Sequence, residues 1–431
     1  MRKQFIILSL MLLSLATCPA NADDAIVFAD PLVESICINI WDTNQDGVFS
    51  VTEAAAVTDL GIAFNSDASN ITSFDELKYF TGLQSIPDRA FYRCFKLKSV
   101  TIPEGVTNIG TEAFYFSKSL SSLTIPSSVN SIGERAFYYE IDYQDEEWGL
   151  VKSRSLSVDI SDFTAWCKID MADNVFTEID DRYRKSESWK YVGALQGYTL
   201  LVNGTNWADL KIPEDITEIK KNAFAYSKPN AVILHDGITS IGDNAFRFSH
   251  ASFSGGKGIK YIGDNAFEYS GIPSFEFSEG LTYIGSYAFA NSLIQSLVLP
   301  TSVETIGNYA FDNCSNLSEI YVFNTEPIVL GMPIGRTRAG VASSVFNGVD
   351  KAKAILYVPK GCVEKYRAAE GWDEFLNIVE MESSTGISGL IKNRSVFDVY
   401  DMSGRKVRNA VKSLDGLQKG IYIVNGRKVM M

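Results

Sequence analysis

The hexapeptide Ile262-Gly263-Asp264-Asn265-Ala266-Phe267 decides the fold, because related versions of it return along the chain at a nearly fixed spacing. Its Ala-Phe pair recurs with the alanine at positions 90, 113, 136, 223, 245, 266, 288 and 310. The steps between these positions are 23, 23, 87, 22, 21, 22 and 22 residues. Such a period is typical of a solenoid, in which each turn buries its apolar face against its neighbours. The array as a whole is therefore the expected functional object.

Two kinds of segment alternate within each repeat. Leu97–Pro103 and Leu120–Pro126 alternate apolar and polar residues, which predicts strands, and the closing proline ends the pairing because it has no N–H. Val106–Phe114 contains a glycine that permits a turn into a short helical piece. The pattern predicts an α/β repeat solenoid of the leucine-rich-repeat type, with parallel stacked strands and short helical turns on the opposite side.

Charge and hydropathy exclude some classes of protein and indicate export. The 431 residues carry a net charge of −13, which argues against a nucleic-acid-binding protein. Arg2-Lys3, an apolar run over residues 5–15 and Ala20-Asn21-Ala22 predict a cleaved signal peptide over residues 1–22. Cys18 leaves lipidation as an alternative. No later stretch is long and apolar enough to cross a bilayer. The expected location is secreted or on the outer cell surface.

The cysteines do not form an expected disulfide framework. After the signal peptide an odd number remains, and two of them, Cys94 and Cys314, stand three residues after a repeat phenylalanine. Other turns carry serine at that place, such as Ser117 and Ser270. The position therefore requires a small side chain at a tight corner, and we expect these cysteines to be structural.

A calcium-binding loop is predicted before the repeats, in a cap over residues 23–66. Residues 42–53 satisfy every fixed position of the twelve-residue D-x-[DN]-x-[DN]-G-x5-E loop, and both flanks are compatible with helix. The expected oxygen ligands are the side chains of Asp42, Asn44, Asp46, Ser50 and Glu53 and the carbonyl of Val48. The alternative interpretation is a solvated acidic turn.

The Ile-Pro…Ile-Gly…Ala-Phe repeat and the phrase Ile71–Leu83 resemble BspA-type leucine-rich-repeat proteins of Bacteroidetes. The preceding calcium loop is similar to the amino-terminal cap of that group. The resemblance covers roughly residues 25–382. It implies a secreted or surface protein, because several members are adhesins for host matrix proteins or for other bacteria. We place the repeats at 67–382, with a C-terminal cap near 354–382.

The 87-residue step predicts an irregular insertion near residues 138–205. Ile160–Ile169 and Leu200–Gly204 resemble degenerate turns of the family, and Leu210–Pro213 restores the register. Glu140–Gly149 and Asp180–Lys190 are charged and without pattern, which predicts loops that leave the solenoid.

Residues 383–431 are predicted to form a linker and a small β module. Asn425-Gly426 lies between β-rich flanks, which favours a hairpin with a type I′ turn. This tail resembles the carboxy-terminal sorting domain of the type IX secretion system, although it is shorter than many such domains.

No constellation typical of an enzyme is visible. The two histidines, His235 and His250, fit no zinc or triad pattern. Asp243 and Asp264 occupy equivalent places on neighbouring turns, where paired carboxylates would suit glycosidase chemistry. Both lie beside asparagines within the repeat, so a polar ladder that caps the turns is the favoured interpretation. The expected protein is not an enzyme.

An aromatic row is the candidate partner-binding site. Two residues after successive repeat phenylalanines stand Phe116, Tyr139, Tyr226, Phe248 and Tyr269. Aromatic residues are enriched at protein interfaces, but such a row also suits packing between turns, which is the favoured alternative.

Three functions remain open. The first is an adhesin that binds host extracellular proteins or cell-surface glycans, with a structural calcium site. The second is an assembly component of the bacterial surface, and the third is a glycan-binding or glycan-processing accessory protein.

Overall fold

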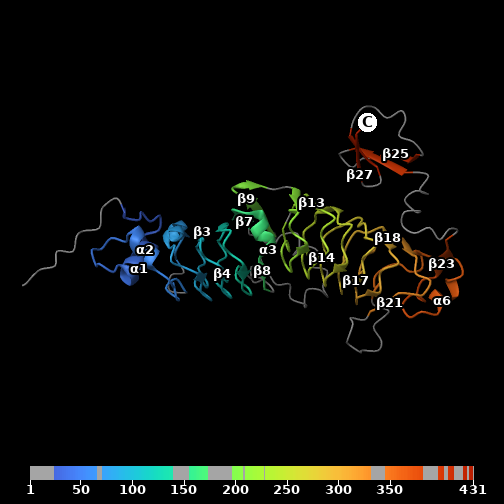
Figure 1. Ribbon diagram of the computed structural model, residues 1–431, viewed down its shortest axis with the longest axis horizontal. Coiled ribbons are helices and arrows are strands. Elements are labelled where there is room, and N and C mark those ends of the chain that lie inside the picture. The colour runs from blue at the N-terminus through green and yellow to red at the C-terminus, as the bar shows by residue number, and fades with distance from the viewer. Residues whose placement is uncertain are drawn as a thin grey trace, which may run out of the picture. The chain divides into compact units, whose positions relative to one another are not determined.

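The fold was analysed in a computed structural model (Figure 1), which describes residues 24–65, 70–138, 155–172, 197–206, 209–227, 229–331, 345–381, 397–401, 406–411, 421–424 and 427–430. The predicted signal peptide and the loops at 140–149 and 180–190 lie outside these residues. The chain divides into two compact units. The first comprises Met1–Leu234, Ile241–Phe253 and Ala266–Gly271, and the second comprises His235–Ser240, Ser254–Asn265 and Ile272–Met431.

The first unit begins with a helical cap that continues into the first turns. Helices α1 (Pro31–Trp41) and α2 (Val51–Ala56) flank the predicted calcium loop, and a 3-10 helix η3 (Asp75–Tyr79) follows. The ring of Phe64 stacks on Phe91 of the first repeat, with centroids 5.4 Å apart. The cap thereby covers the apolar end of the array with an aromatic side chain of its own.

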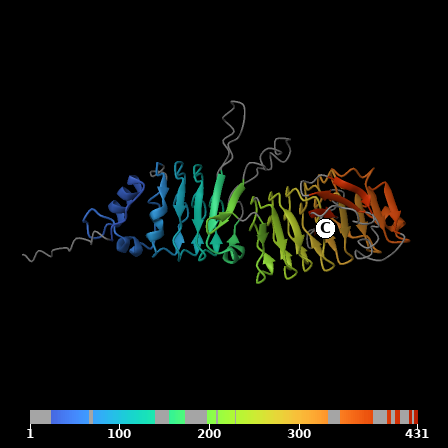
Figure 2. The same cartoon turned by 90° about the horizontal axis from the view of Figure 1, so that it is seen from above.

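The strands of the first unit form parallel sheets whose neighbours come from successive turns (Figure 2). Ser99 lies opposite Ser122 and Val100 opposite Leu123, so equivalent residues of the repeat face each other. One sheet has the order β1 (Ser73–Phe74), β3 (Ser99–Thr101), β5 (Ser122–Ile125), β7 (Ser155–Ile160), β9 (Gly197–Val202) and the antiparallel β10 (Thr205–Asn206). A second has the order β2 (Ser85–Ile86), β4 (Asn108–Ile109), β6 (Ser131–Ile132) and β8 (Asp170–Met171). A further parallel pair is β11 (Asp209–Lys211) with β13 (Ala231–Leu234).

The 87-residue step therefore continues the solenoid where it is described. Strand β7 pairs with β5, and β9 pairs with β7, both in parallel. Between β7 and β8 the structure adds helix α3 (Phe163–Lys168), which begins at Asp162 because that side chain accepts hydrogen bonds from Thr164 and Ala165 N–H. The remaining short strands of the repeats are β12 (Glu218–Ile219), β14 (Ser240–Ile241) and β15 (Ser252–Gly255).

The second unit contains two parallel sheets of the same kind. The first has the order β16 (Tyr261–Ile262), β17 (Tyr283–Ile284), β19 (Thr305–Ile306) and β21 (Val329–Leu330). The other has the order β18 (Ser296–Leu299), β20 (Glu319–Val322), β22 (Ile355–Val358) and β23 (Asn377–Glu380). A separate four-stranded antiparallel sheet has the order β25 (Lys406–Val411), β24 (Phe397–Asp401), β26 (Ile421–Val424) and β27 (Arg427–Met430).

The predicted hairpin in the tail is present. Strands β26 and β27 pair antiparallel, and Val424 lies opposite Arg427. Two residues therefore join the strands, as the Asn425-Gly426 pair predicts, although these two residues lie outside the described part of the chain.

Stacked phenylalanine rings form the core of the array. Phe91 lies 4.8 Å from Phe114, and Phe246 lies 5.6 Å from Phe267, with nearly parallel rings in both pairs. Each of these four side chains is 0% exposed. The Ala-Phe pair thus marks the position at which each turn packs directly on the next.

The Ala-Phe segments consist of consecutive turns with two left-handed residues each. In the first repeat, Ala90 N–H donates to Pro87, Tyr92 to Arg89 and Cys94 to Phe91. The residue before the alanine and the residue two after the phenylalanine have positive φ, for example 58° at Arg89 and 62° at Arg93. Asparagine recurs at both places in later turns, as expected from its tolerance of this conformation.

The repeat glycine has a different role from the one predicted. Gly242 and Gly285 are absent from the glycines with positive φ, so the turn does not require their conformational freedom. A Cβ added to Gly242 would lie 2.7 Å from the backbone N of Lys221, and one added to Gly285 would lie 2.4 Å from the carbonyl carbon of Gly263. The glycine is needed because the backbone of the preceding turn occupies the space of a side chain.

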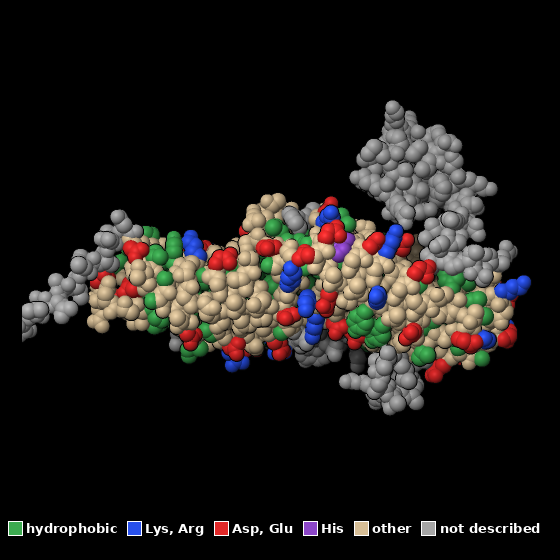
Figure 3. All heavy atoms as spheres, viewed as in Figure 1, with side chains coloured by type: hydrophobic (Ala, Val, Ile, Leu, Met, Phe, Trp, Pro, Cys, Tyr) green, Lys and Arg blue, Asp and Glu red, His purple; other side chains and the backbone are tan. Residues whose placement is uncertain are grey.

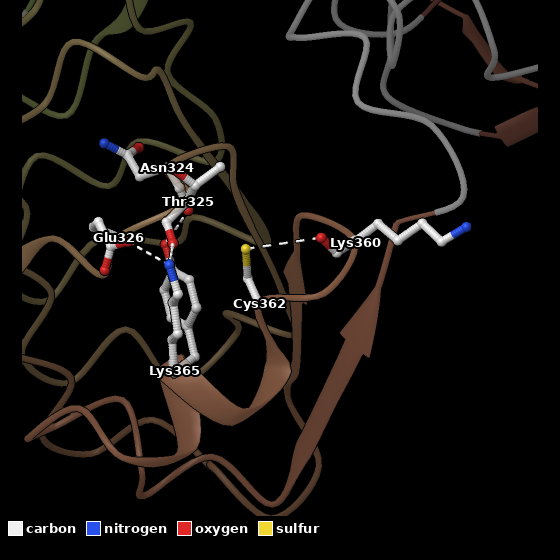
Figure 4. Close-up of polar contacts among 7 residues, drawn as sticks. Asn324, Thr325, Glu326, Lys360, Cys362 and Lys365 are labelled. Carbon is white, nitrogen blue, oxygen red and sulfur yellow. Dashed lines mark hydrogen bonds and ion pairs between the residues drawn. The ribbon is translucent and has the colours of Figure 1, made fainter.

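The last turns end in a cap built around helix α6 (Val363–Arg367). Lys365 donates to the carbonyl of Thr325 and pairs with Glu326 (Figure 4). Tyr366 Oη donates to the carbonyl of Asn324 over 2.8 Å. The indole N–H of Trp372, which is fully buried, donates to the carbonyl of Ile328 over 2.9 Å. The cap therefore covers the final turn with hydrogen-bonded aromatic side chains.

Candidate functional site

The sheet β18-β20-β22-β23 has an apolar outward surface, which we call the tyrosine face: Val298, Tyr321, Ile355, Tyr357 and Val379. Pairing between the strands places Val298 opposite Tyr321, Tyr321 opposite Tyr357, and Tyr357 opposite Val379. The two tyrosine rings stack with centroids 4.4 Å apart and an angle of 5° between their planes. Val379 is 44% exposed, and the other four side chains are half-buried.

The opposite side of the same strands fixes this surface in place. Leu297, Ile320 and Leu356 alternate with the outward residues and are each 0% exposed. A shift by one residue would exchange the two faces and expose this core, so the register is strongly specified. The tyrosine face is consequently ordered before any partner arrives.

Spacing from the Ala-Phe pair does not indicate the tyrosine face. Earlier turns have Thr101 and Thr124 at the outward position that Tyr321 occupies, so the repeat pattern alone does not mark it as special. The available signal was the alternation within the strand itself. In Ile355-Leu356-Tyr357-Val358 a tyrosine stands on the side that the solenoid leaves outward.

A second outward row lies on the sheet β16-β17-β19-β21. Tyr261 and Tyr283 stack with centroids 4.9 Å apart, and Tyr261 is 40% exposed. Val329 of β21 is in the same register row and is 55% exposed. Figure 3 shows hydrophobic side chains in small patches among interspersed acidic and basic side chains.

The structure buries two of the four described residues of the predicted aromatic row. Tyr226 and Phe248 are 7% and 4% exposed, whereas Phe116 and Tyr269 are half-buried. Phe248 stacks between Tyr226 at 5.2 Å and Tyr269 at 4.6 Å. Tyr139 lies outside the described residues. Packing between turns therefore accounts for the arrangement of Tyr226 and Phe248.

The backbone conformation of this row is left-handed, but so is that of the exposed Arg93 at the same place in the first repeat, so the stacking of neighbouring rings is what buries Tyr226 and Phe248. Tyr226, Phe248 and Tyr269 have φ values of 64°, 58° and 56°. Beside the rings, Arg247 pairs with Glu268, with Nε 2.7 Å from Oε2, and Glu268 is 2% exposed. The row belongs to a satellite cluster of packed rings with a buried ion pair next to it.

The predicted calcium loop folds as a helix–loop–helix segment. Asp42 accepts hydrogen bonds from the N–H groups of Gln45 and Gly47, at 2.7 and 2.9 Å, and Asp46 accepts from Val48 N–H at 2.8 Å. Gly47 has a φ of 80°, which favours glycine at the sharp turn. The loop geometry therefore agrees with the role that the motif gives to its glycine.

Glu53, the last predicted ligand, is held by the protein itself. Its carboxylate accepts hydrogen bonds from Thr43 N–H, at 2.9 Å, and from Ser50 N–H, at 3.0 Å, and Ser50 caps α2 in return. Partial burial acts to raise the pKa of Glu53, but these hydrogen bonds lower it below its ordinary value. Among the described residues no three His, Cys, Asp or Glu side chains are grouped as a metal site would require.

The repeat aspartates act on the backbone of the next turn. Asp264 Oδ1 accepts from Ser286 N–H at 2.7 Å, and Asp88 Oδ1 accepts from Thr111 N–H at 2.7 Å. The favoured interpretation of a polar ladder thus fits Asp264 better than a catalytic carboxylate does, because its oxygen already stabilises the turn.

The five described cysteines, Cys37, Cys94, Cys167, Cys314 and Cys362, are free and buried. Cys94 donates to the carbonyl of Phe64, and Cys314 to that of Phe289, at 3.1 and 3.2 Å. Ser117 makes the same bond to Phe91 at 3.1 Å. The corner position therefore uses cysteine and serine alike, as a small donor to the neighbouring turn.

Comparison with known proteins finds a sequence family to which part of the repeats is similar. The family profile described as BspA type Leucine rich repeat region matches in six copies, over residues 63–145 and 249–328. No curated protein matches the chain. In the part of the chain that the structure describes, none of the helices is both long and apolar enough to span a bilayer.

Several solved structures are similar to this chain. A leucine rich cell surface protein from Faecalibacterium prausnitzii A2-165 is 20% identical, with 67% of this chain and 86% of that chain covered and a TM-score of 0.30. A leucine-rich repeat protein from Bacteroides ovatus ATCC 8483 is 17% identical, with 76% and 88% covered and a TM-score of 0.28. The pneumococcal vaccine antigen PcpA is 15% identical, with 78% and 86% covered and a TM-score of 0.36. The stacked parallel strands show a solenoid of the leucine-rich-repeat type, and residues 63–145 and 249–328 are similar to BspA-type repeats.

Proposed function

We propose that this protein is a secreted or cell-surface binding protein, an adhesin that holds a host extracellular protein against its solenoid. The observation that carries the proposal is the tyrosine face, where stacked Tyr321 and Tyr357 lie on a sheet with a fixed register. The similarity of residues 63–145 and 249–328 to BspA-type repeats supports a surface location.

The tyrosine face suits protein recognition for two physical reasons. Tyrosine combines a large apolar ring with a hydroxyl group, and such residues dominate the energy of many interfaces. A sheet that is already ordered loses little conformational entropy when it binds. A stable complex buries about 800 Å² on each partner, so neighbouring strands and loops would contribute the polar rim.

We also propose a structural calcium site in the amino-terminal cap. Its ligands would be Asp42, Asn44, Asp46, Ser50, Glu53 and the Val48 carbonyl, which are the oxygen donors that calcium prefers. In the structure Glu53 accepts hydrogen bonds from Thr43 and Ser50, so calcium binding would require it to give up part of that network. The ion would then stabilise the cap rather than act on a ligand.

Export is proposed to use both ends of the chain. Residues 1–22 would direct secretion and be removed, and the β module within residues 383–431 would act as a type IX sorting domain. The support is the signal-like sequence at the first end and, at the second, an antiparallel sheet with the order β25-β24-β26-β27.

An assembly role on the bacterial surface is the second candidate. Among the strands that the structure describes, β23 is the last of its sheet and pairs with β22 alone. Such an edge presents backbone groups that can pair with another chain, and Val379 on it is 44% exposed. Self-association through β23 would favour this function over adhesion.

The test measures, by surface plasmon resonance, the binding of the purified protein to two immobilised host extracellular proteins, fibronectin and fibrinogen. The double variant Tyr321→Thr, Tyr357→Thr replaces both tyrosines by threonine. Threonine suits this position, because Thr101 and Thr124 occupy it in earlier turns. We expect it to weaken binding by about 2 kcal/mol or more, as for hot-spot residues.

The matched control removes two other stacked tyrosines. Tyr287 and Tyr309 lie 4.9 Å apart, on the turn segment, at φ values of 56° and 59°. Tyr287→Asn, Tyr309→Asn introduces the asparagine found at this place in Asn265 and should leave binding unchanged. Equal loss in both variants, or self-association in sedimentation without binding to any host protein, would contradict the adhesin proposal.

A further inference from the structure

Two basic and two aromatic side chains lie together on the first two turns, far in sequence from the tyrosine face. They are Arg93 and Phe95 on one turn and Phe116 and Lys118 on the next, and we call this group the cationic corner. Arg93 and Lys118 are exposed, while the two rings are half-buried. The segment lies between the Ala-Phe turns and strand β3 or β5, so a rigid backbone presents it.

The rings hold the cations in place. The guanidinium carbon of Arg93 lies 5.8 Å from the ring centroid of Phe116 and 5.6 Å from that of Tyr92. Lys118 Nζ lies 5.6 Å from the centroid of Phe95. Phe95 and Phe116 meet edge to face at 6.4 Å. These cation–π contacts restrict two otherwise flexible side chains to one place.

The charges of the corner are available for a partner. Arg89 pairs with Glu112, with Nε 2.6 Å from Oε2, but neither Arg93 nor Lys118 has a carboxylate within ion-pair distance among the described residues. Residues 89–138 carry six Lys and Arg and three Glu, a net charge of +3, within a chain of −13. This segment is therefore more basic than the chain as a whole.

We propose that the cationic corner binds an anionic polysaccharide that carries sulfate or carboxylate groups along its chain. The inference rests on the proposed function, because it assigns a glycan partner class to a surface binding protein. The Arg93 guanidinium can donate two hydrogen bonds to a planar or tetrahedral anion, and Lys118 supplies a second charge on the next turn. Because the rings order both cations beforehand, binding costs little side-chain entropy.

Other polyanions fit the corner less well. Single-stranded nucleic acid needs free aromatic faces on which bases stack, whereas here the faces are taken by Arg93, Lys118 and the neighbouring rings. A protein partner needs an apolar centre, and the corner is charged at its exposed surface. Arg93 and Lys118 place two positive charges on consecutive turns, which suits a polymer that carries more than one anionic group along its chain.

The experiment compares the full protein with charge variants on immobilised heparin, in 0.15 M and 1 M salt. Arg93→Asn uses the residue of the equivalent Asn291 and Asn313, which have φ values of 58° and 55°, close to the 62° of Arg93. Lys118→Ser uses the residue found at the equivalent position 315. The two substitutions together should weaken binding about tenfold, which corresponds to about 1.4 kcal/mol, because they remove two exposed charges that would pair with the polyanion.

The matched control removes two lysines from other turns. Lys257→Ser, Lys260→Thr replaces two exposed lysines by the residues of equivalent places in other repeats, such as Ser127 and Thr282. It removes the same charge and should keep heparin binding within about twofold, while 1 M salt should abolish binding because the screening length falls to about 3 Å. Circular dichroism confirms that both variants remain folded.

Three competitors identify the partner class. Polygalacturonate should compete with heparin if carboxylate suffices, and its failure would restrict the partner to sulfated chains. Stronger competition by polyglutamate or by single-stranded DNA would overturn the glycan inference, as would equal loss of binding in the control variant. Because the corner variants leave Tyr321 and Tyr357 intact, they should retain binding to a host protein, so the two proposals fail independently.

Discussion

Replacing Gly285 by alanine tests why the repeat has a glycine there: because of its conformational freedom, or because the backbone of the preceding turn leaves no room for a side chain. The two explanations predict opposite signs for the change in the free energy of unfolding. Gly285 does not have a left-handed φ, so if conformational freedom alone mattered, alanine should stabilise the fold by about 0.4–1 kcal/mol through the unfolded chain. The structure predicts the opposite. An added Cβ would lie 2.4 Å from the carbonyl carbon of Gly263 and 2.6 Å from the N of Asp264. Real contacts of this kind are longer, and both atoms belong to the backbone.

The expected cost follows from these distances. Overpacking a close-packed region costs about 1–3 kcal/mol, and a clash with backbone belongs near the upper end because no side chain can rotate away. Subtracting the unfolded-state gain leaves a net destabilisation of about 2 kcal/mol. In a solenoid the effect should be concentrated on the altered turn and its neighbours.

The assay is urea unfolding combined with hydrogen exchange of the second unit. Gly280→Ala is the matched control, because its added Cβ would meet only Lys260 Cγ, at 3.9 Å, which is ordinary contact. It should be neutral or slightly stabilising. Faster exchange should appear in the Gly285 variant around Ile284 and Ile306, which pair across β17 and β19. If Gly285→Ala matched Gly280→Ala in stability, the steric explanation would be wrong.

The remaining predictions concern the core, the thiols, the metal and export. Phe267→Ala should cost about 3–5 kcal/mol in urea unfolding, because the ring is fully buried against Phe246; a negligible change in midpoint would mean that the repeat register is wrong. Burial raises the pKa of Cys94 to about 12 and that of Cys314 to about 11, so both thiols stay protonated at pH 8.5 and should escape alkylation until urea unfolds the chain, as mass spectrometry can show. Calcium should raise the melting temperature of the cap, and Glu53→Ala should remove most of that rise; equal calorimetric binding by both proteins would contradict the site. Deleting residues 396–431 should leave the repeats folded but held in the periplasm, and normal display on the cell surface would refute the sorting role.

The solenoid was predictable from the sequence because its signal is periodic. Ala-Phe pairs at a constant spacing require a core position in every turn, and Phe91, Phe114 and Phe267 are indeed fully buried. The corner occupied by Cys94 and Ser117 was predictable for the same reason, since two small residues that alternate at one position share one packing requirement.

The orientation and the contacts of individual side chains could be predicted less well from the sequence. The spacing of Tyr226 and Phe248 identifies a row, but only the stacking of their rings across neighbouring turns shows that these two side chains are buried. The reason for glycine at Gly285 depends on the distance between turns, which no single repeat contains. The cationic corner combines Arg93 with Lys118 through rings on two turns, so it exists only once the turns are stacked.

Backbone hydrogen bonds between turns also determine how the array would carry mechanical load. Phe91 N–H donates to Ala113 and Phe114 N–H to Ala136, so these bonds run along the stacking direction and not along the strands. A weak pulling force between the ends of one unit would therefore break the hydrogen bonds between neighbouring turns a few at a time. Each turn of about 22 residues that peels away would release on the order of 70 Å of chain. The array would thereby lengthen stepwise and absorb the work of a pull.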